Sequence, residues 1–156
     1  MEKKTGPNPT DRAKLGVKRS VLSDGNGIPL GIEIDGANRH DMKLFLRTLL
    51  SIPIPRPSPT PDEPQNIVLD KGYDYDIIYQ QAVDFGLIPH IHALGEPGKA
   101  LKAGEKARRW VVERLHSWMN RFRHLLIRWA KKPENYLAMI HLAFACILFK
   151  QSRAAV

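Results

Sequence analysis

The stretch NIVLDKGYDYDIIYQQAVDFGLIPHIH, residues 66–92, decides the fold class. Its first four residues, Asn66–Leu69, form a short apolar run that is typical of a buried strand. Tyr75–Phe85 then spaces its apolar residues as a helix does, and Leu87–His92 predicts a second strand. Strands that alternate with helices indicate an α/β domain.

The residues before this stretch predict a hairpin followed by a helix. Lys14–Asp24 and Ile28–Asp35 are β-type runs, and the glycines of the intervening 25–27 turn permit positive φ angles. Met42–Leu50 has the apolar spacing of a short helix, with Asp41 near its start, where a carboxylate suits the helix dipole. The elements therefore run in the order hairpin, helix, strand, helix, strand, helix, helix.

A proline-rich spacer interrupts this order between residues 52 and 64. It holds six of the twelve prolines of the chain, a composition that blocks both helix and central strand and favours an extended surface segment. The length of 156 residues suits one domain with a real core. We expect that domain over residues 14–150, with a lead segment at 1–13, the spacer inside it and a tail at 151–156.

The last third of the chain is expected to be helical, with one apolar stripe that faces the core. Core packing is favoured over base stacking for this stripe, because its tryptophans share it with aliphatic residues. The opposite, polar side carries Arg109, Glu113, His116, Asn120 and His124. A final helix is expected from about Glu134 to Lys150, after Pro133. The residues of the apolar stripe are Val111, Leu115, Trp118, Phe122, Leu125 and Trp129.

Positive charge is concentrated in one segment. The formal net charge is +8, and residues 99–132 hold eleven Lys and Arg against two Glu, so the rest of the chain is close to neutral. Such a surface suits a polyanion, and nucleic acid is the commonest partner. A solvated helix with spare lysines is the alternative.

Cysteine use and apolar length indicate a cytoplasmic protein. Cys146 is the single cysteine, which excludes an intrachain disulfide and a thiolate zinc cluster. The longest apolar run, Leu137–Phe149, is shorter than the roughly 20 residues that span a bilayer, so we expect a core helix and no membrane. The first twelve residues do not have the pattern of a secretory signal.

Asp70 is the first candidate for chemistry, because it stands where an apolar strand ends and is followed by Gly72. Ligands of α/β sheets usually bind at this edge, and a carboxylate there is a natural ligand for Mg²⁺. The alternative is that Asp70 merely caps the next helix.

Glu113 is the second candidate, since it is an acid within RRWVVERLHSWMNRFR, residues 108–123, a segment rich in cations. A carboxylate repels phosphate unless a bound divalent metal reverses the sign and bridges the two. The alternative is an ion pair with Arg109, one helical turn away, which contributes only a few tenths of a kcal/mol on an exposed helix.

Five segments together resemble the DDE transposases of bacterial insertion sequences, of the insertion-sequence-five type. The resemblance runs from Thr5 to about Lys150 and implies a ribonuclease-H-like fold, a mixed sheet flanked by helices. It also implies two Mg²⁺ or Mn²⁺ ions held by three carboxylates, for DNA cleavage and strand transfer. Asp70, with Gly72 and Tyr73, matches the second acid of the family, and Glu113 matches the third. The segments are TGPNPTDR (5–12), DGNGIPLG (24–31), ANRHD (37–41), LDKGYD (69–74) and RRWVVERLHSWMNRFR (108–123).

Two departures from the family pattern matter. Lys106 and Asn120 stand where related transposases have Tyr and Lys that contact DNA. The first aspartate of the family lies on a strand upstream of residues 5–12, so we expect that strand and its acid to be missing here. Asp11 and Asp24 are poor substitutes, because one is in the TDR motif and the other is at the hairpin turn. The chain then resembles a downstream reading frame or a decayed copy, which would act with an upstream half or another transposase copy.

Several basic residues are candidate phosphate contacts for the ends of the element and for target DNA, with ordinary solvated charge as the alternative for each. The same charge would also serve a catalytically inactive, regulatory transposase fragment that only binds DNA. Zinc binding by His116 and His124 is a weaker interpretation, because no cysteine or tight carboxylate motif accompanies them. The candidate contacts are Arg12, Lys14, Lys18, Arg109, Arg114, Arg121 and Arg123.

Overall fold

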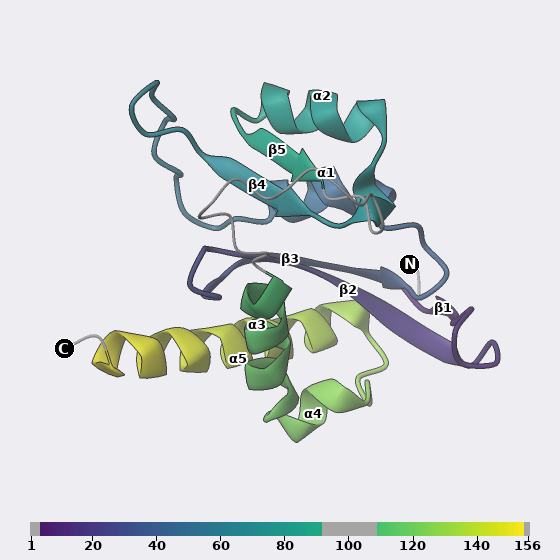
Figure 1. The fold of residues 1–156 in the computed structure, drawn as a ribbon. Helices are drawn as coiled ribbons and strands as arrows, with labels where there is room; N and C mark the ends of the chain where they lie inside the picture. Colours follow the sequence, from purple (N-terminus) through teal and green to yellow (C-terminus); the bar gives the residue numbers. More distant parts are fainter. Residues whose placement is uncertain (1–3, 92–108, 155–156) are drawn as a thin grey trace.

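A computed structural model describes residues 4–91 and 109–154 of the chain, and its elements have the predicted order apart from two additional short elements, β1 and α4 (Figure 1). The α/β class is confirmed. The strands are β1 (Gly6–Pro7), β2 (Leu15–Ser23), β3 (Pro29–Gly36), β4 (Asn66–Leu69) and β5 (Ile88–Ile91). The helices are α1 (Met42–Leu50), a 3₁₀ turn at Lys71–Tyr73, α2 (Asp76–Asp84), α3 (Arg109–Asn120), α4 (Arg123–Leu126) and α5 (Pro133–Ala154).

The strands of the described residues form two sheets, whereas the family resemblance implied one mixed sheet. β1, β2 and β3 pair antiparallel in that order, and β4 pairs with β5 in parallel. Within residues 4–91 and 109–154 no strand hydrogen-bonds to both β2 and β4, so the two sheets are not joined. β1 itself was not predicted, and its Gly6 lies opposite Gly16 at the start of β2.

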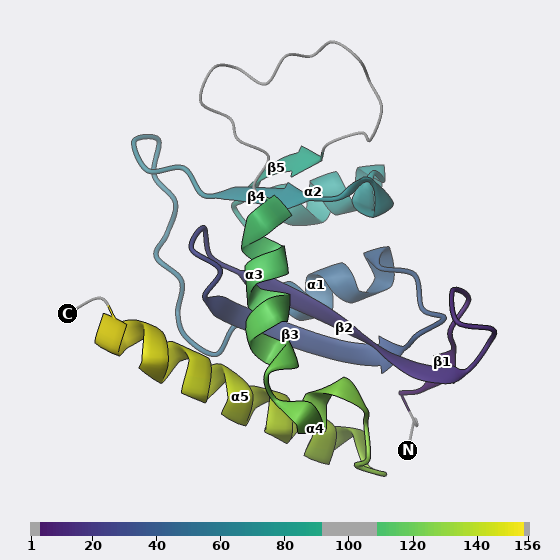
Figure 2. The same ribbon diagram turned by 60° about the horizontal axis from the view of Figure 1, so that its bottom comes forward.

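The β2–β3 hairpin lies between α1 on one face and α3 and α5 on the other (Figure 2). Side chains alternate between the two faces of a strand, so Ile32 and Ile34 point to the same face. Both are buried there in one core cluster with Leu115 and Met119 of α3 and Ile140 of α5. This packing fixes α3, which carries Glu113, against the hairpin.

The opposite face of the hairpin packs on α1, which also holds the second sheet. Phe45 of α1 shares a second core cluster with Ile67 of β4 and Ile78 of α2, and Leu22 of β2 packs against it. Gly31 of β3 permits the close approach of α1. A Cβ atom there would lie 2.7 Å from the Ser51 hydroxyl oxygen and 2.9 Å from a backbone carbonyl oxygen.

The hairpin turn and the proline-rich spacer agree with the sequence prediction. Gly27 has φ +86, and the Asp24 carboxylate accepts backbone hydrogen bonds from Asn26 and Ile28, both at 2.8 Å. Asp24 is therefore a turn residue. Residues 52–64 contain no helix or strand, and the Arg56 guanidinium stacks on the Phe85 ring at 4.6 Å, which folds the spacer back onto the end of α2.

The predicted apolar stripe is buried or partly buried as far as Leu125. The prediction is wrong at Trp129, which is 78% exposed. The helical period is interrupted after Asn120 and resumes for only four residues in α4, so residues beyond Leu126 no longer follow it. The final helix also extends beyond the predicted range of 134–150. α5 is the one helix in the described ranges whose length and composition would suit a bilayer, and 22% of the relevant window is buried.

Candidate functional site

Asp70 is held at the end of β4 as the N-cap of the 3₁₀ turn. Its Oδ1 accepts a hydrogen bond from the Gly72 backbone N–H at 2.9 Å, so the interpretation of Asp70 as a cap is confirmed. The side chain is exposed, and within residues 4–91 and 109–154 its second oxygen, Oδ2, has no hydrogen-bond partner. An oriented carboxylate with one open oxygen is a suitable ligand for a hard cation such as Mg²⁺.

Tyr73 anchors the loop that carries Asp70. Its ring packs at 5.9 Å from the Phe45 ring of α1. Burial, together with the nearby charges of Asp41 and Asp70, raises the pKa of Tyr73 to about 12, although a hydrogen bond with Ser20 acts in the opposite direction. The hydroxyl therefore stays protonated at neutral pH. Tyr73 ties the loop after β4 to α1 and β2, which fixes the position of Asp70.

Glu113 lies on the exposed side of α3, between the buried residues Val111 and Leu115. Arg114 braces this part of the helix against the hairpin, because its guanidinium donates to the Asn26 carbonyl oxygen at 3.3 Å and stacks on the Trp110 ring at 4.4 Å. The prediction that Arg114 contacts a phosphate stays a prediction. The side chain of Arg109 lies outside the described residues.

Asp70 and Glu113 come from different layers of the fold. In Figures 1 and 2 the amino-terminal end of α3 is its end nearest to β4. Their convergence on one metal site remains a prediction. Over residues 4–91 and 109–154 no three His, Cys, Asp or Glu side chains form a group that could hold a metal ion. The carboxylate type fits Mg²⁺ or Mn²⁺, but these two acids need a further ligand from elsewhere.

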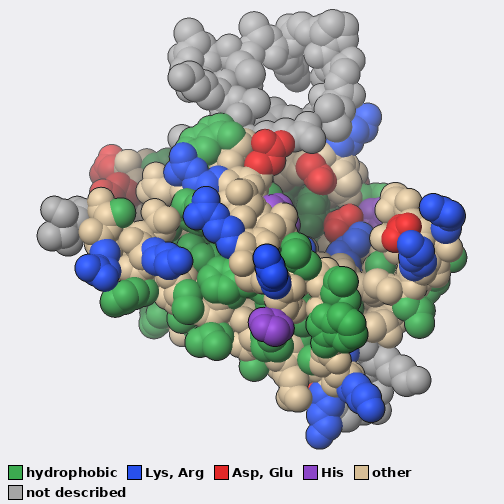
Figure 3. Space-filling model, turned by 90° about the horizontal axis from the view of Figure 1, so that it is seen from below, with side chains coloured by type: hydrophobic (Ala, Val, Ile, Leu, Met, Phe, Trp, Pro, Cys, Tyr) green, Lys and Arg blue, Asp and Glu red, His purple; other side chains and the backbone are tan. Residues whose placement is uncertain are grey.

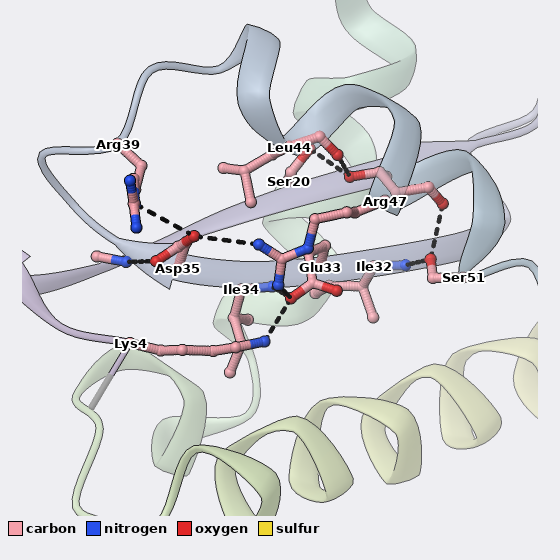
Figure 4. A network of polar contacts seen from close by, with 12 residues as sticks. Lys4, Ser20, Ile32, Glu33, Ile34, Asp35, Arg39, Leu44, Arg47 and Ser51 are labelled. Atoms are coloured by element: carbon pink, nitrogen blue, oxygen red, sulfur yellow. Dashed lines mark hydrogen bonds and ion pairs between the residues drawn. The ribbon is translucent and has the colours of Figure 1, made fainter. Parts of the chain in front are cut away.

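A second pair of acids, which the sequence analysis missed, lies on β3 beneath α1 (Figure 4). Glu33 is 2.8 Å from Arg47 and 2.6 Å from Lys4. Asp35, only 8% exposed, is 3.3 Å from Arg47 and 3.6 Å from Arg39. The spacing of two residues on a strand, which puts both acids on one face, was the available signal. Cations neutralise both carboxylates, so this cluster is structural.

Comparison with known proteins now decides the family. Residues 2–148 match the family described as Transposase DDE domain. The chain belongs to this family. A relative from Burkholderia cepacia, named as a transposase for insertion sequence element IS402, is 34% identical over 154 residues, which are 97% of this chain and 72% of the relative. No solved structure matches the chain.

The basic residues near the start of this DDE domain differ in their surroundings. Arg12 is exposed in the turn between β1 and β2. Lys14 lies 3.6 Å from Asp11, and Lys18 is 3.1 Å from Asp41 at the start of α1. Lys18 is thus already paired and has less charge to offer a phosphate than Arg12 has.

The basic residues of the second half lie where α3 meets α4. Arg121 and Arg123 are exposed, and Arg121 lines a shallow hollow with Trp118 and Lys150. Arg121 and Lys150, beside the ring of Trp118, form a surface that the phosphate and sugar of DNA could occupy. Lys106 lies outside the described residues, as does the whole of 99–108 in the basic segment 99–132.

The two histidines that the sequence placed on the polar side of the helical segment, His116 in α3 and His124 in α4, differ in burial. His124 is exposed, whereas His116 is partly buried. Burial lowers the pKa of His116 below its usual value of 6.5, and the nearby positive charge of Arg19 lowers it further. In the described part of the chain neither histidine belongs to a group that could bind a metal ion. The zinc interpretation therefore has no support from this structure.

Proposed function

We propose that this DDE domain is part of an insertion-sequence transposase of the insertion-sequence-five type, which cleaves DNA and transfers strands during transposition. One observation carries the proposal: the family match spans nearly the whole chain. Asp70, within the matched residues, supports it as an oriented, exposed carboxylate at a strand end. The resemblance of the LDKGYD and RRWVVERLHSWMNRFR segments supports the finer family type.

Asp70 and Glu113 are proposed as ligands of two Mg²⁺ or Mn²⁺ ions. Such ions, when bound, activate a water or 3′-hydroxyl nucleophile and stabilise the leaving oxygen at a DNA phosphodiester. The protein's part is to hold hard oxygen ligands in place. The Gly72 N–H orients Asp70, and the partly buried ring of Tyr73 keeps its loop against α1.

A third carboxylate is proposed to lie upstream of residues 5–12, as the resemblance implies. Two features agree with this. The 154 residues that align make up 72% of the relative from Burkholderia cepacia, so the relative extends beyond them. β1 pairs antiparallel with the start of β2, which directs the preceding chain along the edge of β2. A strand that also paired with β4 would join the two sheets into one mixed sheet of ribonuclease-H-like type.

DNA is proposed to contact the exposed cations, with Arg12 from the β1–β2 turn and Arg121 and Arg123 from the α3–α4 junction. These side chains are exposed, whereas Lys18 pairs with Asp41. The ends of the element and the target site are the proposed DNA partners. Contacts of this kind position the duplex through its phosphates and carry no sequence information themselves.

The experiment compares the 156-residue chain with a version that extends upstream through the proposed strand and its aspartate. Both are incubated with DNA that carries the ends of the element, in Mg²⁺ or in Mn²⁺. We expect both to bind DNA and only the extended version to cut it, because two carboxylates are too few for two divalent ions. Calcium ions and a chelator are the controls.

Robust cutting by the short chain would show that another of its residues supplies the third ligand. Binding without cutting by both versions would overturn the enzyme proposal and leave a regulatory, DNA-binding role. Failure of both versions to bind DNA would overturn the proposal altogether.

A further inference from the structure

His40 and Tyr75 meet at the end of the molecule that carries Asp70. β3 and β4 both finish at the right-hand end in Figures 1 and 2, and the loop after each strand begins there. His40 lies in the loop between β3 and α1, and Tyr75 lies between the Lys71–Tyr73 turn and α2. Their rings contact edge to face, with centroids 5.5 Å apart. Both side chains are exposed, and the chemistry proposed above uses neither.

The loop between β3 and α1 connects two regions that we propose to meet DNA. On one side its Ala37 N–H donates to a backbone carbonyl oxygen of β2 at 3.2 Å, which holds the loop beside the turn that carries Arg12. On the other side His40 contacts Tyr75, shortly after Asp70. In Figure 3, where this end is again on the right, Lys, Arg, Asp and Glu side chains lie together. A DNA strand that runs from Arg12 to the proposed metal site therefore passes His40 and Tyr75.

The hydrogen bonds of His40 fix the direction in which the Tyr75 hydroxyl can donate. The Met42 backbone N–H, at the start of α1, donates to His40 Nδ1 at 3.4 Å. The proton of a neutral imidazole is then on Nε2, because only one of its two nitrogens carries a hydrogen. Nε2 is 3.4 Å from the Tyr75 hydroxyl oxygen, so it donates to that oxygen. The hydroxyl keeps its own hydrogen, for which the described part of the chain offers no acceptor.

An oriented O–H donor without an acceptor suits an anion, and phosphate oxygens of DNA accept hydrogen bonds from Tyr side chains. Tyr79, one helical turn further on, provides the contrast, because its hydroxyl already donates to the Asp74 carboxylate at 3.4 Å. Tyr75 is 43% exposed and Tyr79 is 37% exposed. Exposure therefore does not separate the two tyrosines, whereas the direction of the hydroxyl hydrogen does.

We propose that Tyr75 donates a hydrogen bond to a DNA phosphate beside the proposed metal site, and that His40 is a positioning residue that aims this hydroxyl. The inference rests on the proposed function, because the phosphate belongs to the strand that the DDE domain would cut. His40 acts through Tyr75 and touches no DNA itself. The contact holds the strand next to Asp70 and carries no sequence information, as is general for phosphate contacts.

The first test replaces single phosphates of the element's ends by neutral methylphosphonates and measures binding to the 156-residue chain. At one phosphate near the site that the upstream-extended version cuts, the replacement should weaken wild-type binding by about 10-fold, the scale of a hydrogen bond to a charged group. Tyr75→Phe should bind unmodified DNA about 10-fold more weakly, and the same replacement should cost it less than about 3-fold more. Tyr79→Phe is the matched control and should behave as the wild type at every phosphate.

A double-mutant cycle tests the role of His40. His40→Ala alone should weaken binding by about 3-fold, because the hydroxyl is still present but no longer aimed. Adding it to Tyr75→Phe should cause no further loss, because His40 acts only through that hydroxyl. His40→Gln should recover the wild-type affinity, since its amide can place an N–H donor near the position of Nε2. Thermal unfolding followed by circular dichroism checks that each variant is folded.

Wild-type affinity in Tyr75→Phe would overturn the proposal and leave the pair as a clasp between two loops. So would a Tyr75→Phe chain that is as sensitive as the wild type to every methylphosphonate. Losses that multiply in the double variant would overturn the positioning role of His40. All these outcomes leave the proposed function standing, whereas failure of both the short and the extended protein to bind DNA would overturn the proposed function and this inference together.

Discussion

Asp35 and Asp70 both end a β-strand region, yet the fold surrounds them in opposite ways. Asp35 is buried under α1, with Arg47 at 3.3 Å and Arg39 at 3.6 Å. Asp70 is exposed, accepts one backbone hydrogen bond from Gly72, and forms no ion pair within the described ranges. A carboxylate whose charge is already neutralised has nothing left to offer a metal ion. A carboxylate that is oriented but not neutralised can still bind one.

The same contrast explains why position in the sequence alone did not separate the two acids. The partners of Asp35 come from α1 and from the turn before it, and only tertiary packing brings them together. A substitution that removes the charge and keeps the volume should therefore lower stability at Asp35 and activity at Asp70.

The largest effect is expected for Asp70→Asn in the upstream-extended protein. Metal-dependent DNA cleavage should fall by more than about 100-fold, because loss of even an outer-shell partner of a metal site typically costs 10–100-fold. Asp74→Asn is the matched control, since Asp74 is an exposed acid of the same loop. Equal losses of cleavage in both variants would show that the loop, and not the Asp70 carboxylate, matters.

A smaller effect, on stability, is expected for Asp35→Asn. Loss of the charge beside Arg47 and Arg39 should lower the free energy of unfolding by about 2 kcal/mol, the scale of hydrogen bonds to charged groups. The corresponding fall in melting temperature is about 6 °C for a chain of this size. Asp70→Asn should change stability by less than about 0.5 kcal/mol, because Asn caps as well as Asp. Thermal unfolding of both variants measures these changes. A larger loss of stability in Asp70→Asn than in Asp35→Asn would contradict the comparison.

The smallest effect concerns His116, whose pKa is lowered by burial and by Arg19. The folded protein then binds this proton less readily than the unfolded chain does, so the unfolded state gains as pH falls. The stabilisation is present above the usual pKa of about 6.5 and is lost as the pH drops through the lower, folded value. His116→Gln should flatten the dependence of melting temperature on pH below neutrality. An unchanged pH profile would show that other groups control it.

Sequence patterns predicted the elements whose apolar period is long enough to read. The hairpin around Gly27, the α1 helix and the strand before Asp70 all follow from such patterns. β1 was missed because Gly6 and Pro7 carry no period and pair only through tertiary structure. Trp129 was misplaced because a helical period cannot show where the chain leaves the helix.

Individual candidate residues of the site could be predicted from the sequence, but the tertiary contacts around them could not. Asp70 could be found from the strand and glycine beside it. Nothing in the sequence indicates that Arg114 reaches Asn26 of the hairpin turn. The network of Glu33, Asp35 and Arg47 likewise depends on the packing of α1 against β3.

The central claim is that Asp70 and Glu113 share one divalent metal site, and metal-directed cleavage of the backbone tests it most directly. Fe²⁺ replaces Mg²⁺ in the upstream-extended protein, and the hydroxyl radicals that it generates with peroxide cut the nearest peptide bonds. We predict cuts near Asp70 and near Glu113 in the same sample, competed by excess Mg²⁺ and lost together in Glu113→Gln. Cuts near only one of the two acids, or cuts near Asp70 that persist in Glu113→Gln, would contradict the claim.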